Sequence, residues 1–478
     1  MTTTEDAPAP AGAHAYPAAT RAGAASRLAP YAVGGAALVV YCTMSLARLH
    51  RLASQSWDVA IFEQAIRGYA HLSAPIVDVE GPGYNFFGDH FSPALAVFAP
   101  FYRLFPSAAT LLVGQALLIA ASVVVVTRLA LRRVGTAAGV VIGASYAVSW
   151  GVQSAVNFDF HEVALATPLL ALAGAAFVER DWRRVVLFAA PLVLVKEDLA
   201  LTAATIGLVV ALAGGRRYGV GLLLGSIGAF LVETLVVIPA YNPEGVYNYW
   251  PQAGAGPGLL GRLWGLPHEM VSPTVKVSTL LLVVAVSALL ALRSPWLLVA
   301  VPNLVIRFVS DNQNYWSTDW HYSLTTMTVV FVALVDGIAR ARRRGPDWLR
   351  RYAVHAPAAV GAVALVLCMQ FPFRTLLQPS TYAGGPRATH AQQVLAMIPD
   401  GTSVVTDIGL ITPLVAGHTV YWVGRTNASV TADYVLLDDS TWGGQPPAVV
   451  SYAEQLQPAA TYRLVYDAGG FQLAQRVG

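Results

Sequence analysis

The stretch Val185–Ala213, VVLFAAPLVLVKEDLALTAATIGLVVALA, is almost wholly apolar apart from three consecutive charged residues, Lys196, Glu197 and Asp198. Ionisable side chains are costly inside a bilayer and are usually paired or exposed to water. The stretch therefore predicts two short membrane spans, at about 185–196 and 199–213, that turn back at one membrane face. The charges form either a hairpin tip in the headgroup region or a site where Lys196 binds an anionic ligand.

The whole chain shares this apolar character. It has 478 residues, of which 55% are hydrophobic and 12% charged, and its mean hydropathy is +0.54. This composition is typical of a polytopic membrane protein and excludes an ordinary soluble domain. The net charge of +3 comes from short Arg-rich connections, so nucleic acid is not an expected partner. Cys42 and Cys368 lie inside apolar spans and are interpreted as packing residues.

Apolar segments long enough to cross about 30 Å of hydrocarbon recur along the chain. The first has no convincing cleavage site and predicts a retained helix. About eleven spans are expected, at 28–47, 107–127, 136–156, 162–178, 185–196, 199–213, 218–239, 275–292, 295–310, 322–338 and 353–371. Phe91–Phe105 is shorter and contains Pro93 and Pro100, so it predicts a helix lying in the outer interface.

Arginine placement predicts the orientation, because cytoplasmic loops are enriched in Lys and Arg. The Arg-rich connections contain Arg128, Arg132, Arg133, Arg180, Arg183, Arg184, Arg216, Arg217, Arg293, Arg340, Arg342, Arg343, Arg344, Arg350 and Arg351. With these loops inside and an odd number of spans, the N-terminus is cytoplasmic and the C-terminal region extracytoplasmic. We expect a multi-pass protein of the plasma membrane.

Three parts follow from this organisation. Residues 1–27, rich in Ala, Pro and Thr, predict a disordered cytoplasmic tail. Residues 28–371 form the expected transmembrane domain, an all-α polytopic bundle with interfacial helices in its first outer loop. In residues 372–478, buried strands are indicated at 403–406 and 434–437 and a hairpin turn at Gly469-Gly470, so this part predicts a small extracytoplasmic α/β domain.

Four clusters of ionisable residues fall on the predicted outer side. They are Asp58 and Glu63 in WDVAIFEQ, Asp89 and His90 in GDHFSP, Asp159, His161 and Glu162 in NFDFHE, and the Lys196–Asp198 triplet. Together they predict a polar cavity at the outer membrane surface. Structural alternatives are an N-cap for Asp58 and a helix N-terminus for Glu162. A divalent metal near Asp89 and His90 is left open, although no spaced ligand motif supports it.

Two loops add aromatic and polar groups. The loop 311–322, which contains Trp320 and His321, is dense in hydrogen-bonding side chains and suits a sugar or polyol. The loop 241–273 contains Tyr247, Tyr249, Trp250 and Trp264. These aromatic residues either stack on a sugar or prenyl group or are ordinary interfacial residues.

The order of these motifs resembles a bacterial membrane-protein family, domain of unknown function 2079, over most of residues 50–340. The motifs that carry the resemblance are, in chain order, an Asp in the first outer loop, His-Phe-Ser-Pro at the start of a short apolar helix, Phe-Asp-Phe-His-Glu, and Lys-Glu-Asp. That family in turn resembles the GT-C glycosyltransferases, polytopic enzymes that take a sugar from a polyprenyl-phosphate carrier on the outer leaflet. His90–Pro93 is similar to the His-Pro-Pro-Leu opening of protein mannosyltransferase relatives, with Ser92 in place of the first Pro.

The resemblance implies a GT-C-like fold and an inverting transfer of sugar from a polyprenyl-phosphate donor to a glycan, lipid or protein acceptor. By motif position, Asp58 is the expected catalytic carboxylate, a general base for the acceptor hydroxyl, with Glu63 supporting it. Lys196, His90 and Arg103 are the candidates for binding the phosphate. The expected substrate-binding set is completed by Asp89, Asp159, His161, Glu162, Glu197, Asp198, Trp320 and His321.

Two other classes of protein stay open at this point. A transporter or flippase of an envelope lipid or glycan would also gather charges near the membrane, but the chain shows no clear internal repeat. A non-catalytic envelope scaffold would only present the outer domain. The enzyme hypothesis alone requires Asp58, His90, Asp159, His161 and Lys196 to converge on one outer cavity.

Overall fold

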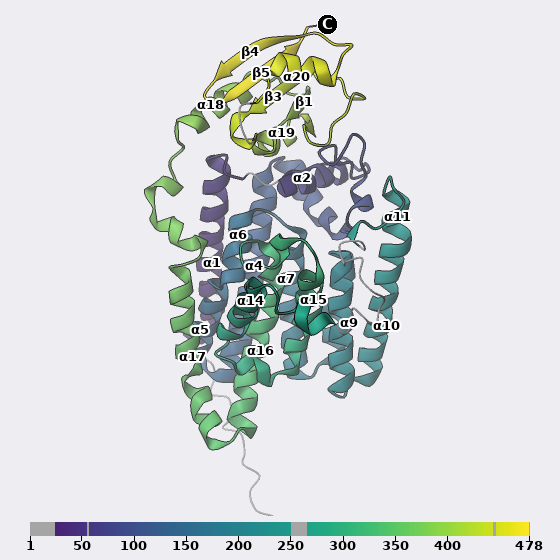
Figure 1. Ribbon diagram of the computed structural model, residues 1–478. Helices are drawn as coiled ribbons and strands as arrows, with labels where there is room; N and C mark the ends of the chain where they lie inside the picture. The colour runs from purple at the N-terminus through teal and green to yellow at the C-terminus, as the bar shows by residue number, and fades with distance from the viewer. Residues whose placement is uncertain (1–23, 55–56, 250–264, 443–445, 478) are drawn as a thin grey trace, which may run out of the picture.

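The computed structural model describes residues 24–54, 57–249, 265–442 and 446–477. Within these ranges a long helical bundle is covered at one end by a small domain with a sheet (Figure 1). Most of the predicted N-terminal tail, residues 1–23, lies outside the described residues. The first helix, α1 (Ala24–His50), begins three residues before the predicted end of that tail, because Ala and Arg are strong helix formers.

Seven helical segments in the described ranges are long and apolar enough to cross a membrane. They are Ser26–His50, Ala108–Val134, Thr136–Phe158, Glu162–Glu179, Arg216–Tyr241, His321–Arg344 and Asp347–Cys368. Each matches one of the eleven predicted spans. The other four predicted spans fall on shorter elements, namely α8 with η4 (Trp182–Leu194), α9 (Glu197–Leu212), α14 (Thr274–Ala285) and η7 with α15 (Pro295–Val309). The predicted number of eleven is therefore not confirmed.

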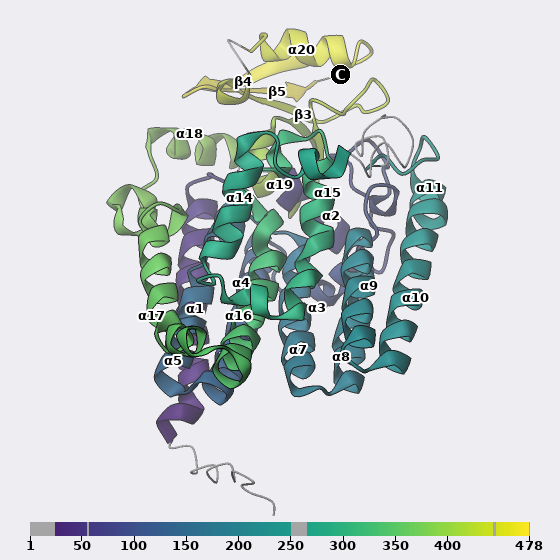
Figure 2. The ribbon, with the colours of Figure 1, turned by 60° about the horizontal axis from the view of Figure 1, so that its bottom comes forward.

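Helix α16 is the centre of the bundle (Figure 2). Its apolar window is 94% buried, and its neighbours include α4 and α7. Helix α16 spans Leu324–Arg344. Besides α1, α9 and α14, the helices around it are α4 (Ala108–Val134), α5 (Thr136–Ala147), α6 (Trp150–Phe158), α7 (Ala166–Glu179), α8 (Trp182–Ala189), α10 (Arg216–Val232), α11 (Ile238–Tyr241), α15 (Val301–Val309) and α17 (Asp347–Cys368). A helix buried on all sides can satisfy its hydroxyl groups only internally; accordingly, the Thr328 hydroxyl lies 2.7 Å from that of Tyr146.

The Arg-rich connections lie together at the end of the bundle farthest from the C-terminal domain (Figures 1 and 2). Arg132 pairs with Glu179 at 3.3 Å, and Arg342 donates to the carbonyl of Val134 at 3.0 Å. These contacts join the α4–α5, α7–α8 and α16–α17 connections. The clustering agrees with the positive-inside rule, while the side of the membrane it faces stays a prediction.

A layer of short helices separates the bundle from the C-terminal domain. It consists of α2 (Trp57–Ala70), η2 (Pro93–Phe98) and α3 (Ala99–Leu104). Because η2 and α3 are so short, the segment 91–105 is not among the candidate spans. Helix α2 joins the parts, since Gln64 donates to the carbonyl of Val420 at 2.9 Å and Arg67 donates to the carbonyl of His418 at 2.6 Å.

The C-terminal domain is built on a five-stranded sheet in the order β2-β1-β3-β5-β4. Its elements are α18 (Pro386–Leu395), β1 (Ser403–Thr406), α19 (Ile411–Val415), β2 (Thr419–Trp422), β3 (Tyr434–Asp438), α20 (Val449–Leu456), β4 (Tyr462–Ala468) and β5 (Phe471–Arg476). β1 pairs in parallel with β2 and β3, whereas β5 is antiparallel to β3 and β4. The two predicted strands and the Gly469-Gly470 hairpin are confirmed.

Candidate functional site

A polar cavity of about 200 Å³ lies where the bundle, the α2 layer and the C-terminal domain meet. It is lined by Asp58, Ile61, Phe62, Glu80, Phe86, Asp89, His90, His161, Glu162, Lys196, Tyr249, Tyr315, His321, Tyr322 and Arg425. An adjoining space of about 100 Å³ shares six of these residues and adds Glu197 and Asp198. The structure thus brings together nine of the predicted site residues: Asp58, Asp89, His90, His161, Glu162, Lys196, Glu197, Asp198 and His321.

The Lys-Glu-Asp triplet does not form a solvated hairpin tip. Lys196, immediately before α9, places its Nζ 2.7 Å from Oε1 of Glu162 on η3 (Glu162–Leu165). The Lys196 side chain is 17% exposed and that of Glu162 is 0% exposed. The pair therefore presents its cation to the polar cavity, with the carboxylate behind it.

His90 forms the second buried ion pair. Its Nδ1 lies 2.8 Å from Oε1 of Glu197, and Oε2 of Glu197 accepts the backbone N–H of Phe91 at 3.2 Å. Burial by itself lowers the pKa of His90, but the nearby carboxylates of Asp89 and Glu197 outweigh it and raise the pKa to about 9. Here too the cation is the more exposed partner, at 15% against 1%.

Asp58 and two histidines form another wall of the cavity. Oδ2 of Asp58 lies 3.9 Å from Nε2 of His161, and the His161 ring stacks on that of His321 with 3.5 Å between centroids. Burial lowers the pKa of His161 to about 3, so its imidazole is neutral at physiological pH. Because α2 begins at Trp57, Asp58 lies inside the first turn, where the helix dipole favours a carboxylate.

The structure separates Glu63 and Arg103 from the polar cavity, in contrast to the predicted roles. Glu63 is fully buried and accepts a hydrogen bond from the Tyr102 hydroxyl at 2.9 Å. Burial raises its pKa to about 8. Five residues after Asp58, it lies on a different face of α2. Arg103 is exposed and donates to the carbonyl of Ala70 at 3.3 Å, so neither side chain meets a ligand in this cavity.

Asp159 and Trp320 also lie outside the cavity lining, but they support it. Asp159 has φ +113° at the end of α6, and its Oδ1 lies 4.0 Å from Nε of Arg48. Gln115 donates to the carbonyl of Asp159 at 2.8 Å and accepts the backbone N–H of His161 at 2.9 Å. Trp320 packs edge-on against Phe158. These contacts hold the turn that carries His161.

Several lining residues were not predicted. They are Glu80, Tyr249, Tyr315, Tyr322 and Arg425. Tyr249 stacks on His90 with 4.8 Å between ring centroids, and its hydroxyl donates to Asp89 at 3.1 Å. It belonged to a recognised aromatic loop, of which residues 250–264, with Trp250 and Trp264, lie outside the described residues. Arg425 follows β2, and only the docking of the C-terminal domain on α2 brings it to the cavity.

Glu80 shows how burial affects a carboxyl group in this cavity. Burial, followed by repulsion from Asp89, raises the pKa of Glu80 to about 7, although Arg425 opposes the shift. The described residues nevertheless contain no group of three or more His, Cys, Asp or Glu side chains arranged to hold a metal ion. The geometry here therefore adds no support to the metal site left open near Asp89 and His90.

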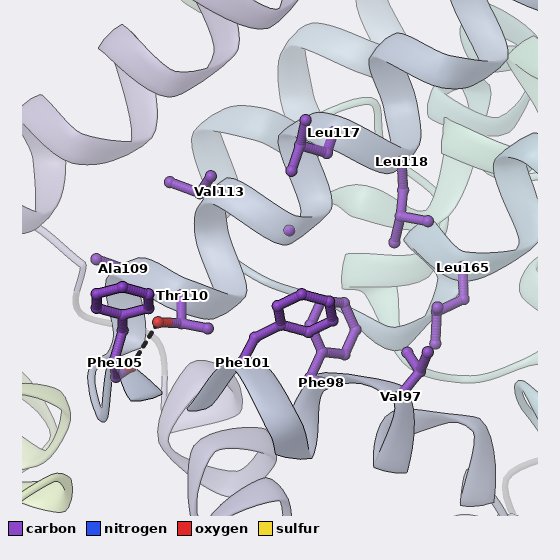
Figure 3. A pocket seen from close by; sticks show the side chains of 11 residues that line it. Val97, Phe98, Phe101, Phe105, Ala109, Thr110, Val113, Leu117, Leu118 and Leu165 are labelled. Carbon is purple, nitrogen blue, oxygen red and sulfur yellow. Dashed lines mark hydrogen bonds between the residues drawn. The ribbon is translucent and has the colours of Figure 1, made fainter. Parts of the chain in front are cut away.

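An apolar groove of about 590 Å³ runs between η2, α3 and α4 (Figure 3). It is lined by Val97, Phe98, Phe101, Phe105, Ala109, Thr110, Val113, Gly114, Leu117, Leu118 and Leu165. The single hydroxyl among these side chains, on Thr110, donates to the carbonyl of Phe105 at 2.6 Å. Phe101, Phe105 and Leu117 are exposed, so the groove opens toward the surroundings of the bundle.

The apolar groove and the polar cavity are close neighbours. The ring of Phe98, in the groove, packs against that of Phe160 with 5.3 Å between centroids. The ring of Phe160 in turn packs against that of Phe62, in the cavity, with 5.5 Å between centroids. The single turn η3 contributes Glu162 to the cavity and Leu165 to the groove. A molecule with a charged head and a long apolar chain would find both environments side by side.

Comparisons with known proteins bear on the family and the fold. The model of the family described as "Predicted membrane protein (DUF2079)" matches residues 48–473. No curated protein matches. Among solved structures, ArnT from Cupriavidus metallidurans bound to undecaprenyl phosphate is 13% identical with a TM-score of 0.55, over 95% of this chain and 99% of that one. Its apo state gives a TM-score of 0.50 at 13% identity, over 90% and 96%. The predicted resemblance to the GT-C fold is confirmed.

Proposed function

The chain belongs to the DUF2079 family of membrane proteins, and from this membership, the ArnT-like fold and the cavity we propose that it is a lipid-linked-sugar glycosyltransferase. Its donor is a sugar joined to a polyprenyl phosphate, and its acceptor carries a hydroxyl group. One observation carries the proposal: cations from three distant segments and the carboxylate of Asp58 line one polar cavity beside an apolar groove.

The donor phosphate binds to the cations of the polar cavity. Lys196 and His90 are the more exposed members of their ion pairs, and Arg425 brings a third positive charge from the C-terminal domain. Positive groups fixed in a partly water-free site stabilise the charge that develops on the leaving phosphate. The polyprenyl chain lies in the apolar groove, as supported by the solved ArnT fold that binds undecaprenyl phosphate.

Asp58 acts as the general base. The acceptor oxygen attacks the anomeric carbon while the bond between that carbon and the phosphate oxygen breaks. The polyprenyl phosphate leaves with the bonding electron pair, and the acceptor proton passes to the Asp58 carboxylate. Because attack and departure occur on opposite faces, the configuration inverts. His161, whose Nε2 lies 3.9 Å from Oδ2 of Asp58, has a lowered pKa because it is buried, so its neutral imidazole adds no positive charge beside the base.

The test is sugar transfer by the purified protein in lipid nanodiscs, with a panel of radiolabelled polyprenyl-phosphate sugars and an envelope extract as the source of acceptor. We expect transfer by the wild type and a loss of about 10²–10⁴-fold in Asp58→Asn. Lys196→Ala should raise the KM for the donor. Asp347→Asn, an exposed carboxylate at the other end of the bundle, is the matched control.

The alternatives are separable in the same preparation. Equal transfer by the wild type, Asp58→Asn and Lys196→Ala would remove the assigned site. Movement of a labelled lipid between leaflets of proteoliposomes, without any transfer, would instead identify a flippase. If no donor in the panel supports either sugar transfer or lipid movement, the protein is a scaffold.

A further inference from the structure

The end of the bundle opposite the polar cavity contains a separate cavity of about 680 Å³, here called the arginine cavity. It lies between the α7–α8 connection, the end of α9, η7 and the last turns of α16. Five arginines line it, namely Arg180, Arg293, Arg340, Arg343 and Arg344, together with one acidic side chain, Asp336. Positive charge therefore far exceeds negative charge in its walls.

The acidic residue neutralises only one of these arginines. Oδ2 of Asp336 lies 2.5 Å from Nε of Arg340 and accepts a hydrogen bond from the Ser294 hydroxyl at 2.7 Å. Arg180 is held in place as well, since it donates to the carbonyl of Ala213 at 2.8 Å and lies over the ring of Trp182. The floor of the cavity is thus built from fixed side chains.

The other three arginines lack an acidic partner. Among the residues that the structure describes, no carboxylate lies within 4.0 Å of Arg293, Arg343 or Arg344. Guanidinium groups favour bidentate pairing with phosphate. Three such groups facing one space at the end of a membrane bundle form a binding surface for an anion.

A role in membrane orientation alone does not account for this arrangement. That role needs only Lys and Arg in short loops near the span ends, and it is met equally by Arg216, Arg217 and Arg351, which do not line the cavity. The arginine cavity also has apolar walls, in which the side chains of Leu212 and Leu298 are 76% and 49% exposed. Cationic and apolar surfaces in one space suit an amphiphilic anion.

We propose that the arginine cavity binds the phosphate headgroup of an anionic membrane lipid, with its acyl chains along Leu212 and Leu298. Basic pockets between helices at a membrane face bind such headgroups, and a volume of about 680 Å³ is within the usual range for small-molecule sites. Inorganic phosphate offers the same chemistry without the chains. The apolar walls favour the lipid.

The test is native mass spectrometry of the full-length protein with phosphatidylglycerol or cardiolipin, against phosphatidylcholine as the neutral lipid. The wild type should retain the anionic lipids. The triple variant Arg293→Gln, Arg343→Gln, Arg344→Gln should lose their retention by about tenfold or more. The triple variant Arg216→Gln, Arg217→Gln, Arg351→Gln removes the same charge at the same end outside the cavity and should retain lipid like the wild type.

Two further arms separate the sources of phosphate and guard against misfolding. Lipid that stays bound in millimolar inorganic phosphate supports the proposal, and lipid displaced by phosphate alone assigns the site to the free anion. Replacing Arg293, Arg343 and Arg344 by Lys keeps the charge needed for insertion and should retain lipid better than the Gln triple. The proposal is overturned if the wild type and both Gln triples retain the anionic lipids equally. It is also overturned if the wild type retains phosphatidylcholine as well as it retains the anionic lipids.

Discussion

The two ends of the bundle use charge in opposite ways. At the polar cavity, Lys196 and His90 each pair with a buried carboxylate of another segment. At the arginine cavity, three guanidinium groups face a common space without an acidic partner among the described residues. Buried ion pairs are fixed in position before a ligand arrives, whereas unpaired arginines gain their partner from it. Charged side chains gather at both ends of the bundle, but only the presence or absence of ion pairs distinguishes the polar cavity from the arginine cavity.

The largest effect should come from the carboxylate that faces the polar cavity. Asp58→Asn keeps the shape of the side chain and removes its basicity, so turnover should fall by about 10²–10⁴-fold. Glu63→Gln, on the same helix but outside the cavity, should keep turnover within roughly tenfold of wild type, because it touches no reacting atom. Rates at saturating donor measure both. Equal losses would restore the catalytic role predicted for Glu63.

The buried pairing itself should carry much of the local stability. Glu162→Gln leaves Lys196 without its buried carboxylate and should lower the free energy of unfolding by about 3 kcal/mol. Glu179→Gln breaks the exposed pair with Arg132 at the other end and should change it by less than about 1 kcal/mol. Thermal unfolding in detergent compares them. Similar losses would mean that burial does not distinguish the two ends.

The cation from the C-terminal domain should act on donor binding. Arg425→Gln removes one of three positive groups from the polar cavity and should raise the KM for the donor by about tenfold. Arg463→Gln, on an exposed part of β4, is the matched control and should leave the KM unchanged. An unchanged KM in Arg425→Gln would confine phosphate binding to the membrane part.

His90 should make donor binding depend on pH. Its pKa is raised to about 9 in the folded protein, above the usual value of about 6.5. The charge it contributes to donor binding is therefore present at neutral pH and lost as pH rises through about 9. Its contribution to stability is likewise full below about pH 6.5 and disappears through about pH 9. Donor KM measured from pH 7 to 10 should rise several-fold in the wild type.

His90→Gln should bind donor more weakly at pH 7 and show no such rise. Parallel pH profiles for the wild type and His90→Gln would assign the titration to another group. Glu80, whose pKa is raised to about 7 mainly by burial, would then be the next residue to test, as Glu80→Gln.

Sequence predicted the fold where the signal is local. Seven predicted spans match long apolar helices, because a run of apolar residues needs no distant partner to be recognised. The four charged clusters could be assigned to one face because each lies in a connection that alternates with the Arg-rich connections. Their pairing could not, because nothing in the sequence indicates that Lys196 meets Glu162, which lies in a different cluster.

Two differences between the predicted site and the structure, at Glu63 and Arg425, share one cause. Glu63 was grouped with Asp58 because the two are close in sequence, yet helical geometry turns Glu63 toward Tyr102. Arg425 carried no motif, and its place depends on contacts of α2 with the C-terminal domain such as Gln64 to Val420. Tertiary packing determines whether such side chains reach the cavity, and neither motif spacing nor hydrophobic periodicity indicates how distant segments pack.

The turn η3 sets a fixed interval between two chemistries. Glu162 and Leu165 are three residues apart on a 3₁₀ helix, so their positions differ by about 6 Å along its axis. On the proposed function, the donor phosphate binds Lys196, the partner of Glu162, and the polyprenyl chain lies along Leu165, so the turn sets the distance between the two binding sites. This turn therefore recognises only the start of the carrier chain, next to the phosphate. It does not select for the number of isoprene units that follow.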